Sequence, residues 1–250
     1  MSEKSKTPPT AGMVVIGNEI LSGKVSDSNS PFVCKELNFI GIELLRIAVI
    51  PDDFEEIGRT VKSFSETYTW VFTSGGIGPT HDDITIPAIA AAFDAAVVQH
   101  PVLDAAIREH YHEKCTDDHL LMARVPEGSE MVEIPGWSFG QVQFRNIYIM
   151  PGVPQLFHHR FNHIKQLLQG IPLHLKEFFL HADEGTIAGI LRGVDEQFPE
   201  VLIGSYPDFF RREYSLKVTV EARDSDLLSE AAGLLESQFR GNGVEIVSIT

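Results

Sequence analysis

Hydrophobic and polar positions along the chain predict strands that alternate with helices. Short runs rich in β-branched and aromatic residues indicate buried strands, and longer amphipathic runs indicate helices. Such strands interleaved with helices imply βαβ units, a parallel sheet and right-handed crossovers. Residues 115–125 show no regular pattern. The predicted strands before residue 170 cover 12–17, 42–50, 70–74, 131–134, 141–144 and 146–150, and the predicted helices cover 29–40, 55–66, 84–93, 102–113 and 155–168.

The order of elements changes after Gly170. Strand, helix, strand, strand, helix and strand follow each other, which is the order of a ferredoxin-like α+β unit. We therefore predict a boundary near Ile171-Pro172, with a larger domain over 11–171 and a smaller one over 172–250. The first ten residues are polar and contain proline, and we expect them to form a disordered leader. The predicted elements of the small domain cover 178–181, 184–197, 201–205, 214–221, 225–239 and 244–249.

Composition, net charge and cysteine spacing disfavour several classes of function. The chain has 250 residues and 43% apolar residues, which is enough for a sizeable core. Its net charge of −15 disfavours nucleic acid and anionic membranes as partners. No apolar run approaches the roughly 18 residues of a membrane span, and the N-terminus lacks a signal-peptide pattern, so we expect a cytoplasmic protein. Cys34 and Cys115 do not form a CxxC pair, and we expect buried thiols rather than a disulfide or zinc site.

The stretch from Thr73 to Thr85 carries the strongest chemical signal, because it places three glycines next to two aspartates. It follows a predicted strand, and ligands bind at the carboxyl ends of strands in open α/β sheets. Glycine lets backbone N–H groups close on an anion without a Cβ in the way. Asp82 and Asp83 could cap the next helix, or they could hold a divalent cation through oxygen ligands. The pattern suggests nucleotide or pterin phosphate chemistry.

Loops after other predicted strands add candidates at the same edge of the sheet. Asp27 and Asn29 lie at the start of a predicted helix, and capping is an equal alternative to ligand binding there. Asp52 could also cap a helix, but if its strand neighbours that of Asp83, the two carboxylates could share one metal-bound phosphate. Gly152 and Pro154 form an anion-friendly turn before a helix, although an ordinary turn is the default explanation. Together the loops favour a composite site.

Histidine and arginine residues give weaker signals. His81 stands inside the glycine loop without an identified partner, so an acid–base role is the less favoured interpretation. His159 and His163 have the i, i+4 spacing of a helical metal pair, but no HExxH pattern surrounds them and a solvated face is favoured. Arg211 and Arg212 could reach a phosphate from the small domain, although a surface loop is the more frequent meaning.

Taken together, these motifs resemble the molybdopterin-binding (MoCF) fold family. The resemblance is to its CinA-like branch, the competence/damage-inducible protein family, which includes the amino-terminal region of eukaryotic-type FAD synthases. It rests on GNEIL at 17–21, the GGxGPTxDDxT loop at 75–85, PGVP at 151–154 and GSYP at 204–207, and it spans nearly the whole chain. The loop match is specific, and the shorter motifs occur in the family's order.

The resemblance implies an α/β fold, with a three-layer MoCF-like domain on a mostly parallel sheet plus a small ferredoxin-like α+β domain. It also implies homo-oligomers and binding of pterin or nucleotide diphosphates, and several members are similar to metal-dependent pyrophosphatases acting on ADP-ribose or FAD. The sequence ends at Thr250 without matching an amidohydrolase or adenylyltransferase domain, so we expect neither activity. Val153 stands where molybdopterin adenylyltransferases tend to have serine, which weakens the molybdenum-cofactor interpretation.

The sequence therefore predicts a metal-dependent nucleotide pyrophosphatase with ADP-ribose or FAD as leading substrates. Asp52 and Asp83 are the predicted catalytic and metal-holding residues, for Mg²⁺, Mn²⁺ or Co²⁺, with potassium as a further candidate. Backbone N–H groups of Gly75, Gly76 and Gly78 would stabilise phosphate charge. A non-catalytic molybdopterin- or nucleotide-binding module is the alternative, and a structural oligomer is a third. The other predicted ligand-binding residues are Gly17, Asn18, Glu19, Asp27, Asn29, Ser74, Pro79, Thr80, Asp82, Thr85, Gly152, Pro154 and Tyr206.

Overall fold

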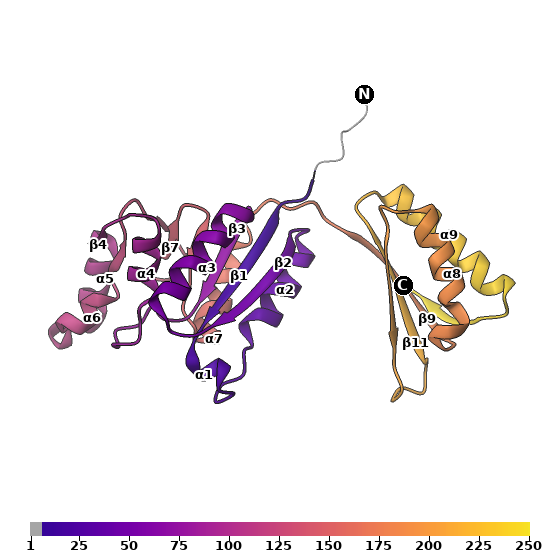
Figure 1. The fold of residues 1–250 in the computed structure, drawn as a ribbon, viewed down its shortest axis with the longest axis horizontal. Helices are drawn as coiled ribbons and strands as arrows, with labels where there is room; N and C mark the ends of the chain where they lie inside the picture. The colour runs from indigo at the N-terminus through magenta and orange to yellow at the C-terminus, as the bar shows by residue number, and fades with distance from the viewer. Residues whose placement is uncertain (1–6) are drawn as a thin grey trace, which may run out of the picture. The chain divides into compact units, whose positions relative to one another are not determined.

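A computed structural model describes residues 7–250, and the chain divides into two compact units between Ile171 and Pro172 (Figure 1). Residues 1–6 of the expected leader lie outside the described residues, and Thr10 already belongs to the first strand. Among the described residues, no helix combines the length and apolar character needed to cross a membrane.

The first unit is built on a six-stranded sheet in the order β2-β1-β3-β8-β7-β6. The strands β2, β1, β3 and β8 run parallel to one another, whereas β7 pairs antiparallel with both β8 and β6. The sheet is therefore mostly parallel, as predicted. Its strands are β1 (Thr10–Ile16), β2 (Glu43–Ile50), β3 (Trp70–Ser74), β6 (Glu130–Val132), β7 (Gln141–Phe144) and β8 (Ile147–Ile149).

Side chains of β1 alternate between two apolar layers, which explains why helices cover both faces of this sheet (Figure 1). Val14 and Ile16 pack with the helices α3 and α4, and Met13 and Val15 pack with α2 and α7. The result is the predicted three-layer arrangement. The helices are α1 (Asn18–Leu21), α2 (Asn29–Phe39), α3 (Phe54–Thr67), α4 (Thr85–Ala92) and α7 (Pro154–Ile164).

A small subdomain departs from the sequence interpretation. The segment at 115–125 contains α6 (Asp117–Leu121) and the start of β5 (Arg124–Pro126), which pairs antiparallel with β4 (Val97–Gln99). Strands of three residues are too short to produce a readable alternation, which is why the pattern missed them. The subdomain also holds α5 (Pro101–Tyr111) and the short helix η1 (His112–Lys114).

The expected burial of the two thiols is wrong. Cys34 is exposed on α2, and Cys115 is half-buried after η1. On α2 the buried apolar residues are Val33 and Leu37, and Cys115 packs against the outside of the first apolar core.

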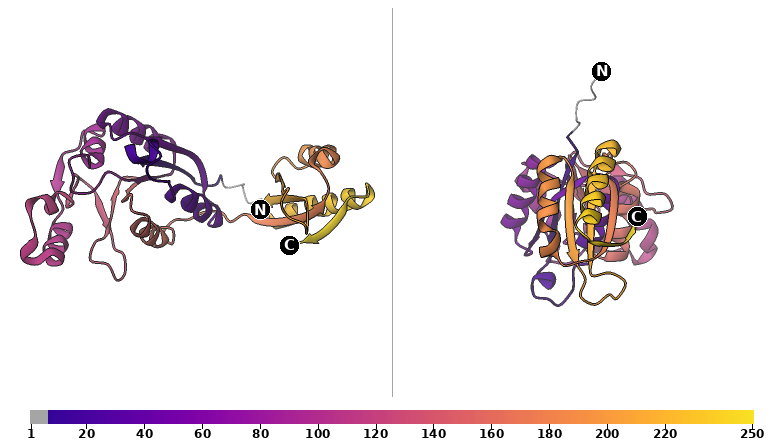
Figure 2. Two further views of the ribbon diagram at one scale, coloured as in Figure 1. Left: turned by 90° about the horizontal axis from the view of Figure 1, so that it is seen from below. Right: turned by 90° about the vertical axis from the view of Figure 1, so that its right-hand side faces the viewer.

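The second unit has a four-stranded antiparallel sheet in the order β10-β11-β9-β12, the strand order of the predicted ferredoxin-like motif. The helices α8 and α9 lie on one face of this sheet (Figure 2), and their apolar residues pack against Phe178, Leu180 and Val218. The elements are β9 (His174–His181), α8 (Glu184–Gln197), β10 (Leu202–Pro207), β11 (Leu216–Ala222), α9 (Ser225–Gly241) and β12 (Glu245–Ile249).

Candidate functional site

Loops from three neighbouring parallel strands meet at the carboxyl ends of these strands in the first sheet. Gly17 follows β1, Gly75 follows β3 and Gly152 follows β8. A Cβ built on Gly152 would stand 3.3 Å from the Gly75 Cα, so these two loops are in close contact. The composite site predicted from the sequence is therefore assembled by the parallel order of the strands.

Gly75 and Gly76 have backbone conformations that only glycine adopts readily. Their φ angles are 111° and 66°. A Cβ on Gly75 would stand 2.2 Å from the carbonyl oxygen of Ile16, and a Cβ on Gly76 would stand 2.2 Å from Thr85 Oγ1. Thr85 is fully buried and fixes this turn, because its hydroxyl donates to the Gly75 carbonyl at 3.0 Å. The loop is thus held as an open backbone cradle.

The free donors of this cradle differ from those expected. The Gly75 N–H donates to the Met150 carbonyl at 3.1 Å and is not available to a ligand, so its predicted role as a donor is wrong. The N–H groups of Gly76 and Gly78 make no hydrogen bond within residues 7–250. Gly75 therefore contributes its conformation, and the two later glycines contribute the anion-binding N–H groups.

Asn29 connects the loops of the site through a buried amide. Only 4% of the residue is exposed. Its Nδ2 donates to Ser74 Oγ and to the Gly152 carbonyl, each at 2.9 Å, which uses both amide protons. Its Oδ1 is buried and has no partner among the described residues. Because a buried acceptor without a donor is costly, this oxygen is suited to a ligand, cation or water.

The structure separates the capping aspartates from those with other roles. Asp27 Oδ1 accepts from the N–H groups of Asn29 and Ser30, so Asp27 holds the start of α2 while Asn29 itself does not cap. Asp53 accepts from the Glu56 N–H at 2.8 Å and caps α3. Asp52 instead accepts from the Asn18 N–H at 2.8 Å and fixes the turn after β1.

Asp83 and Asp82 both interact with Thr80. The N-cap of α4 has no side-chain hydrogen bond, so the capping explanation for these aspartates is wrong. Asp83 Oδ2 accepts from the Thr80 N–H at 2.8 Å and from its hydroxyl. A hydrogen bond from the Thr80 side chain is also the main cause that lowers the pKa of the exposed Asp82 carboxyl. Thr80 has one hydroxyl proton, so the two carboxylates compete for it, and Asp83 has the closer geometry.

We expected Asp52 and Asp83 to share one metal-bound phosphate if their strands were neighbours, and this condition is not met, because β1 lies between β2 and β3. Two strand spacings separate the loops, or roughly 10 Å at the level of the strands. Among residues 7–250, no group of three or more His, Cys, Asp or Glu is placed to hold a metal ion. A cation held by either carboxylate would therefore take its other ligands from water, backbone oxygens and ligand phosphate, as Mg²⁺ often does.

The remaining predicted site residues occupy varied positions. The carboxylate of Glu19 folds back over Gly17, whose Cβ would stand 2.5 Å from Glu19 Oε1. Pro154 begins α7, where its missing N–H has no cost. Asn18 and Pro79 are exposed beside the loops. Tyr206 belongs to the second unit, where its ring lies beneath Lys217 Nζ.

The weaker sequence candidates acquire structural roles. His81 is exposed, and its charge contributes to the lowered pKa of Asp82. His159 and His163 are 5.1 Å apart between ring centroids, and His159 also stacks on Trp137. Arg211 pairs with Asp208 at 3.0 Å inside its own hairpin. The ion pair accounts for Arg211, whereas the ring contacts of His159 leave its buried Nε2 without a hydrogen-bond partner among the described residues.

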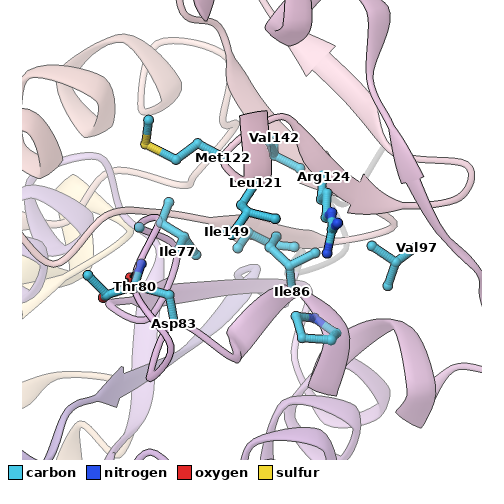
Figure 3. A pocket seen from close by; sticks show the side chains of 12 residues that line it. Ile77, Thr80, Asp83, Ile86, Val97, Leu121, Met122, Arg124, Val142 and Ile149 are labelled. Atoms are coloured by element: carbon cyan, nitrogen blue, oxygen red, sulfur yellow. Dashed lines mark hydrogen bonds between the residues drawn. The ribbon is translucent and has the colours of Figure 1, made fainter. Parts of the chain in front are cut away.

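A pocket of about 200 Å³ opens beside the glycine loop (Figure 3). It contains Arg124, which sequence reasoning missed, because a lone arginine after an irregular segment carries no motif. Figure 3 shows Asp83 and Thr80 at one end and Arg124 at the other, with apolar side chains between them. The lining residues are Ile77, Gly78, Thr80, Asp83, Ile86, Pro87, Val97, Leu121, Met122, Arg124, Val142 and Ile149.

Comparison with known families separates the same two regions of sequence. Residues 12–170 match the probable molybdopterin binding domain, and residues 172–247 match the middle domain of FAD synthase. A probable FAD synthase of Caenorhabditis elegans is 30% identical over 93% of this chain and 50% of its own length. The chain thus spans about half the length of the FAD synthases that it matches.

Other relatives share different parts of the chain. A Thermococcus kodakarensis protein is 33% identical over 91% of this chain and 96% of its own length. A CinA-like protein of Thermotoga neapolitana is 30% identical over 64% of this chain and 41% of its own length. The crystal structure of CinA from Thermoplasma acidophilum aligns with a TM-score of 0.59 and 28% identity, covering 63% of this chain and 96% of that one. The chain therefore belongs to the family of probable molybdopterin-binding domains, with FAD synthase-like and CinA-like relatives.

Proposed function

We propose that this protein is a metal-dependent hydrolase of a dinucleotide-like pyrophosphate. The observation that carries the proposal is the convergence of a glycine cradle, a buried unpaired oxygen and two carboxylates on one edge of a parallel sheet. The cradle offers the N–H groups of Gly76 and Gly78, and the unpaired oxygen is Asn29 Oδ1. Such a set can bind the charge of a pyrophosphate and bring a cation to it.

Asp83 and Asp52 are the proposed cation ligands, and each would hold a cation by itself, because β1 separates their strands. Each has one carboxylate oxygen engaged by a backbone N–H, which fixes its orientation and leaves the second oxygen for a cation. Bound there, a divalent cation would polarise the pyrophosphate and lower the pKa of a water. The chain's own N–H groups at Gly76 and Gly78 would stabilise negative charge on the phosphoryl oxygens.

The proposed reaction is hydrolysis of the pyrophosphate linkage. Water oxygen attacks one phosphorus, the bridging P–O bond breaks, and the second phosphate leaves with its shared electrons. One proton of the water passes to solvent or to the released phosphate. FAD would give FMN and AMP, and ADP-ribose would give ribose 5-phosphate and AMP.

Product analysis tests this proposal. Purified protein is incubated with FAD, ADP-ribose or NADH, with Mg²⁺, Mn²⁺ or Co²⁺ and with or without K⁺, and products are identified by mass spectrometry. The proposal predicts AMP together with the matching monophosphate. Release of adenosine or of inorganic phosphate would show that a different bond is cleaved.

A binding module is the second candidate function. It is supported by the family description of residues 12–170, which refers to probable molybdopterin binding and to no catalytic step. Such a module would hold a molybdopterin or nucleotide unchanged. Recovery of intact ligand after incubation with metals favours it over the hydrolase.

Self-association is part of this proposal. The edge strand β2 exposes Leu45, Ile47 and Val49 along one side of the first sheet. An edge strand with apolar side chains is a template for pairing with another chain, and pairing of β2 with its copy would cover it. We expect Ile47→Lys to shift the mass measured by light scattering from an oligomer to a monomer.

A further inference from the structure

The pocket beside the glycine loop is directly continuous with the proposed phosphate site. Its wall begins at Ile77 and Gly78, one residue after the Gly76 turn. A ligand whose phosphates lie over Gly76 could therefore place its next group in this pocket. The inference below rests on the proposed function, and it concerns what that next group is.

The size and walls of the pocket suit one flat ring system. Pockets that enclose whole drug-sized ligands have volumes of about 300–1,000 Å³, so a pocket of about 200 Å³ encloses only part of a dinucleotide. Ile86, Leu121 and Val142 make the walls apolar. Met122 adds a thioether, which makes favourable contacts with aromatic rings.

Arg124 is the positively charged residue of this lining. Within residues 7–250, its side chain forms no ion pair, hydrogen bond or ring contact. Figure 3 shows it at the end of the pocket away from Asp83, with Ile86 and Val97 beside it. Its guanidinium therefore has donors to offer to whatever enters between the apolar walls.

The chemistry of arginine selects among heterocycles. A guanidinium only donates hydrogen bonds, so the ring edge that faces it must present acceptors. Arginine pairs with adjacent carbonyl oxygen and ring nitrogen atoms, as on guanine, whereas adenine presents an amino donor beside its ring nitrogen and is matched by Asn or Gln. Flavins and oxo-pterins carry the carbonyl and ring-nitrogen pattern.

We propose that this pocket binds an oxo-substituted flat heterocycle, of the flavin or oxo-pterin kind, and that Arg124 selects it over adenine. In a dinucleotide such as FAD, the flavin ring would then occupy the pocket, and the AMP half would leave from the open side of the site. Arg124 is a specificity-determining residue in this arrangement, and it takes no part in bond cleavage.

Equilibrium binding of mononucleotides tests this without turnover. The probes are FMN, neopterin monophosphate and AMP, each titrated by calorimetry into the full chain. Wild type should bind one of the two oxo-ring probes at least tenfold more tightly than AMP. Arg124→Met should weaken the binding of that oxo-ring probe by roughly tenfold or more, the usual range for a charged hydrogen bond. The affinity for AMP should change by no more than about twofold. Which of the two probes binds more tightly identifies the ring.

Matched variants separate this effect from loss of charge. Arg192→Met removes the same charge from an exposed position on α8 and should leave all three affinities unchanged. Arg124→Lys keeps the charge but not the paired donors, and it should recover only part of the oxo-ring preference. Thermal unfolding should be similar for all variants, because Arg124 is exposed.

The possible failures are distinct. If wild type releases AMP from FAD but Arg124→Met binds both oxo-ring probes normally, the hydrolase stands and the pocket assignment is overturned. If FAD is not cleaved but Arg124→Met loses FMN or pterin binding, the assignment stands and the hydrolase is wrong. Two further results would overturn the assignment. The first is wild-type protein that binds AMP as tightly as it binds FMN and neopterin monophosphate. The second is wild-type protein that binds none of the three probes.

Discussion

Both units of this chain combine strands with helices, but they organise them in different ways. In the first unit, parallel strands bring the loops after β1, β3 and β8 to one edge, where they meet at Gly75 and Gly152. In the second unit, β11 runs antiparallel to both β10 and β9, so the loop after β11 leaves the opposite end of the sheet from the loops after β9 and β10. The difference teaches that the strand direction, rather than the composition, concentrates polar loops into a site.

Among the variants, we expect the largest difference between the two units from glycine substitutions. We expect Gly76→Ala to reduce turnover by at least about a hundredfold, because its Cβ would stand 2.2 Å from Thr85 Oγ1 and its φ is 66°. Steady-state assays of AMP release measure the loss. Binding of the intact dinucleotide should weaken in parallel.

The matched control is Gly189→Ala in α8 of the second unit, where a Cβ meets nothing within 4 Å. Because alanine is favoured over glycine in a helix interior, it should stabilise the chain by about 0.5–1 kcal/mol and leave turnover unchanged. Equal losses from both glycine variants would contradict a site confined to the first unit.

Asp83→Asn should abolish metal-dependent turnover while leaving the fold intact. The amide keeps the size of the side chain but removes the charge that a cation requires. The fold should survive because Asp83 does not cap α4. Fluorescence of Trp70 and Trp137, both in the first unit, reports on folding during denaturation.

Asp53→Ala provides the contrast, since Asp53 caps α3. It should lower the free energy of unfolding by about 1 kcal/mol and retain turnover. Normal turnover by Asp83→Asn would show that the metal role is assigned to the wrong residue.

Asn29→Ala should have an intermediate effect. The substitution removes the amide that donates hydrogen bonds to Ser74 Oγ and to the Gly152 carbonyl, so both acceptors lose this donor. We expect KM for the dinucleotide to rise roughly tenfold, with a loss of about 1–3 kcal/mol in unfolding free energy. Steady-state kinetics measures the change in KM, and calorimetric unfolding measures the loss of stability. A change in stability with an unchanged KM would place Asn29 in the framework and not in the site.

The smallest effect concerns acid sensitivity of the second unit. Backbone N–H groups of Leu227 and Asp226 lower the pKa of Asp224, which caps α9. Because the folded pKa is lowered, the cap stabilises the unit above the ordinary carboxyl pKa, and this contribution is lost as pH falls through the folded value. Protection of the α9 amides, measured as the exchange rate relative to the intrinsic rate at each pH, should fall at acid pH in wild type. Asp224→Asn should flatten that dependence, and an unchanged profile would contradict the explanation.

The sequence predicted the fold well because most elements in both units have readable patterns. The β1 run predicts a buried strand, and the glycines at 75 and 76 predict the turn that follows β3. It could not show which aspartates cap helices, because Asp52, Asp53 and Asp83 have the same local chemistry and differ only in what they contact.

The sequence did not predict that Arg124 belongs to the site. This residue reaches the pocket through β5, a three-residue strand whose partner β4 is equally short. The sheet order likewise placed β1 between the strands of Asp52 and Asp83, and strand order is a long-range property that local patterns do not contain.

The most direct test of the central claim is the number of AMP molecules released per protein chain from FAD or ADP-ribose, before and after chelation. A hydrolase should release many AMP molecules per chain with Mg²⁺, Mn²⁺ or Co²⁺. Because the chain carries a net charge of −15, chelation should both stop turnover and weaken dinucleotide binding, and added metal should restore both. Tight binding of intact ligand that survives EDTA, with no AMP after prolonged incubation, would contradict the account and establish a binding module.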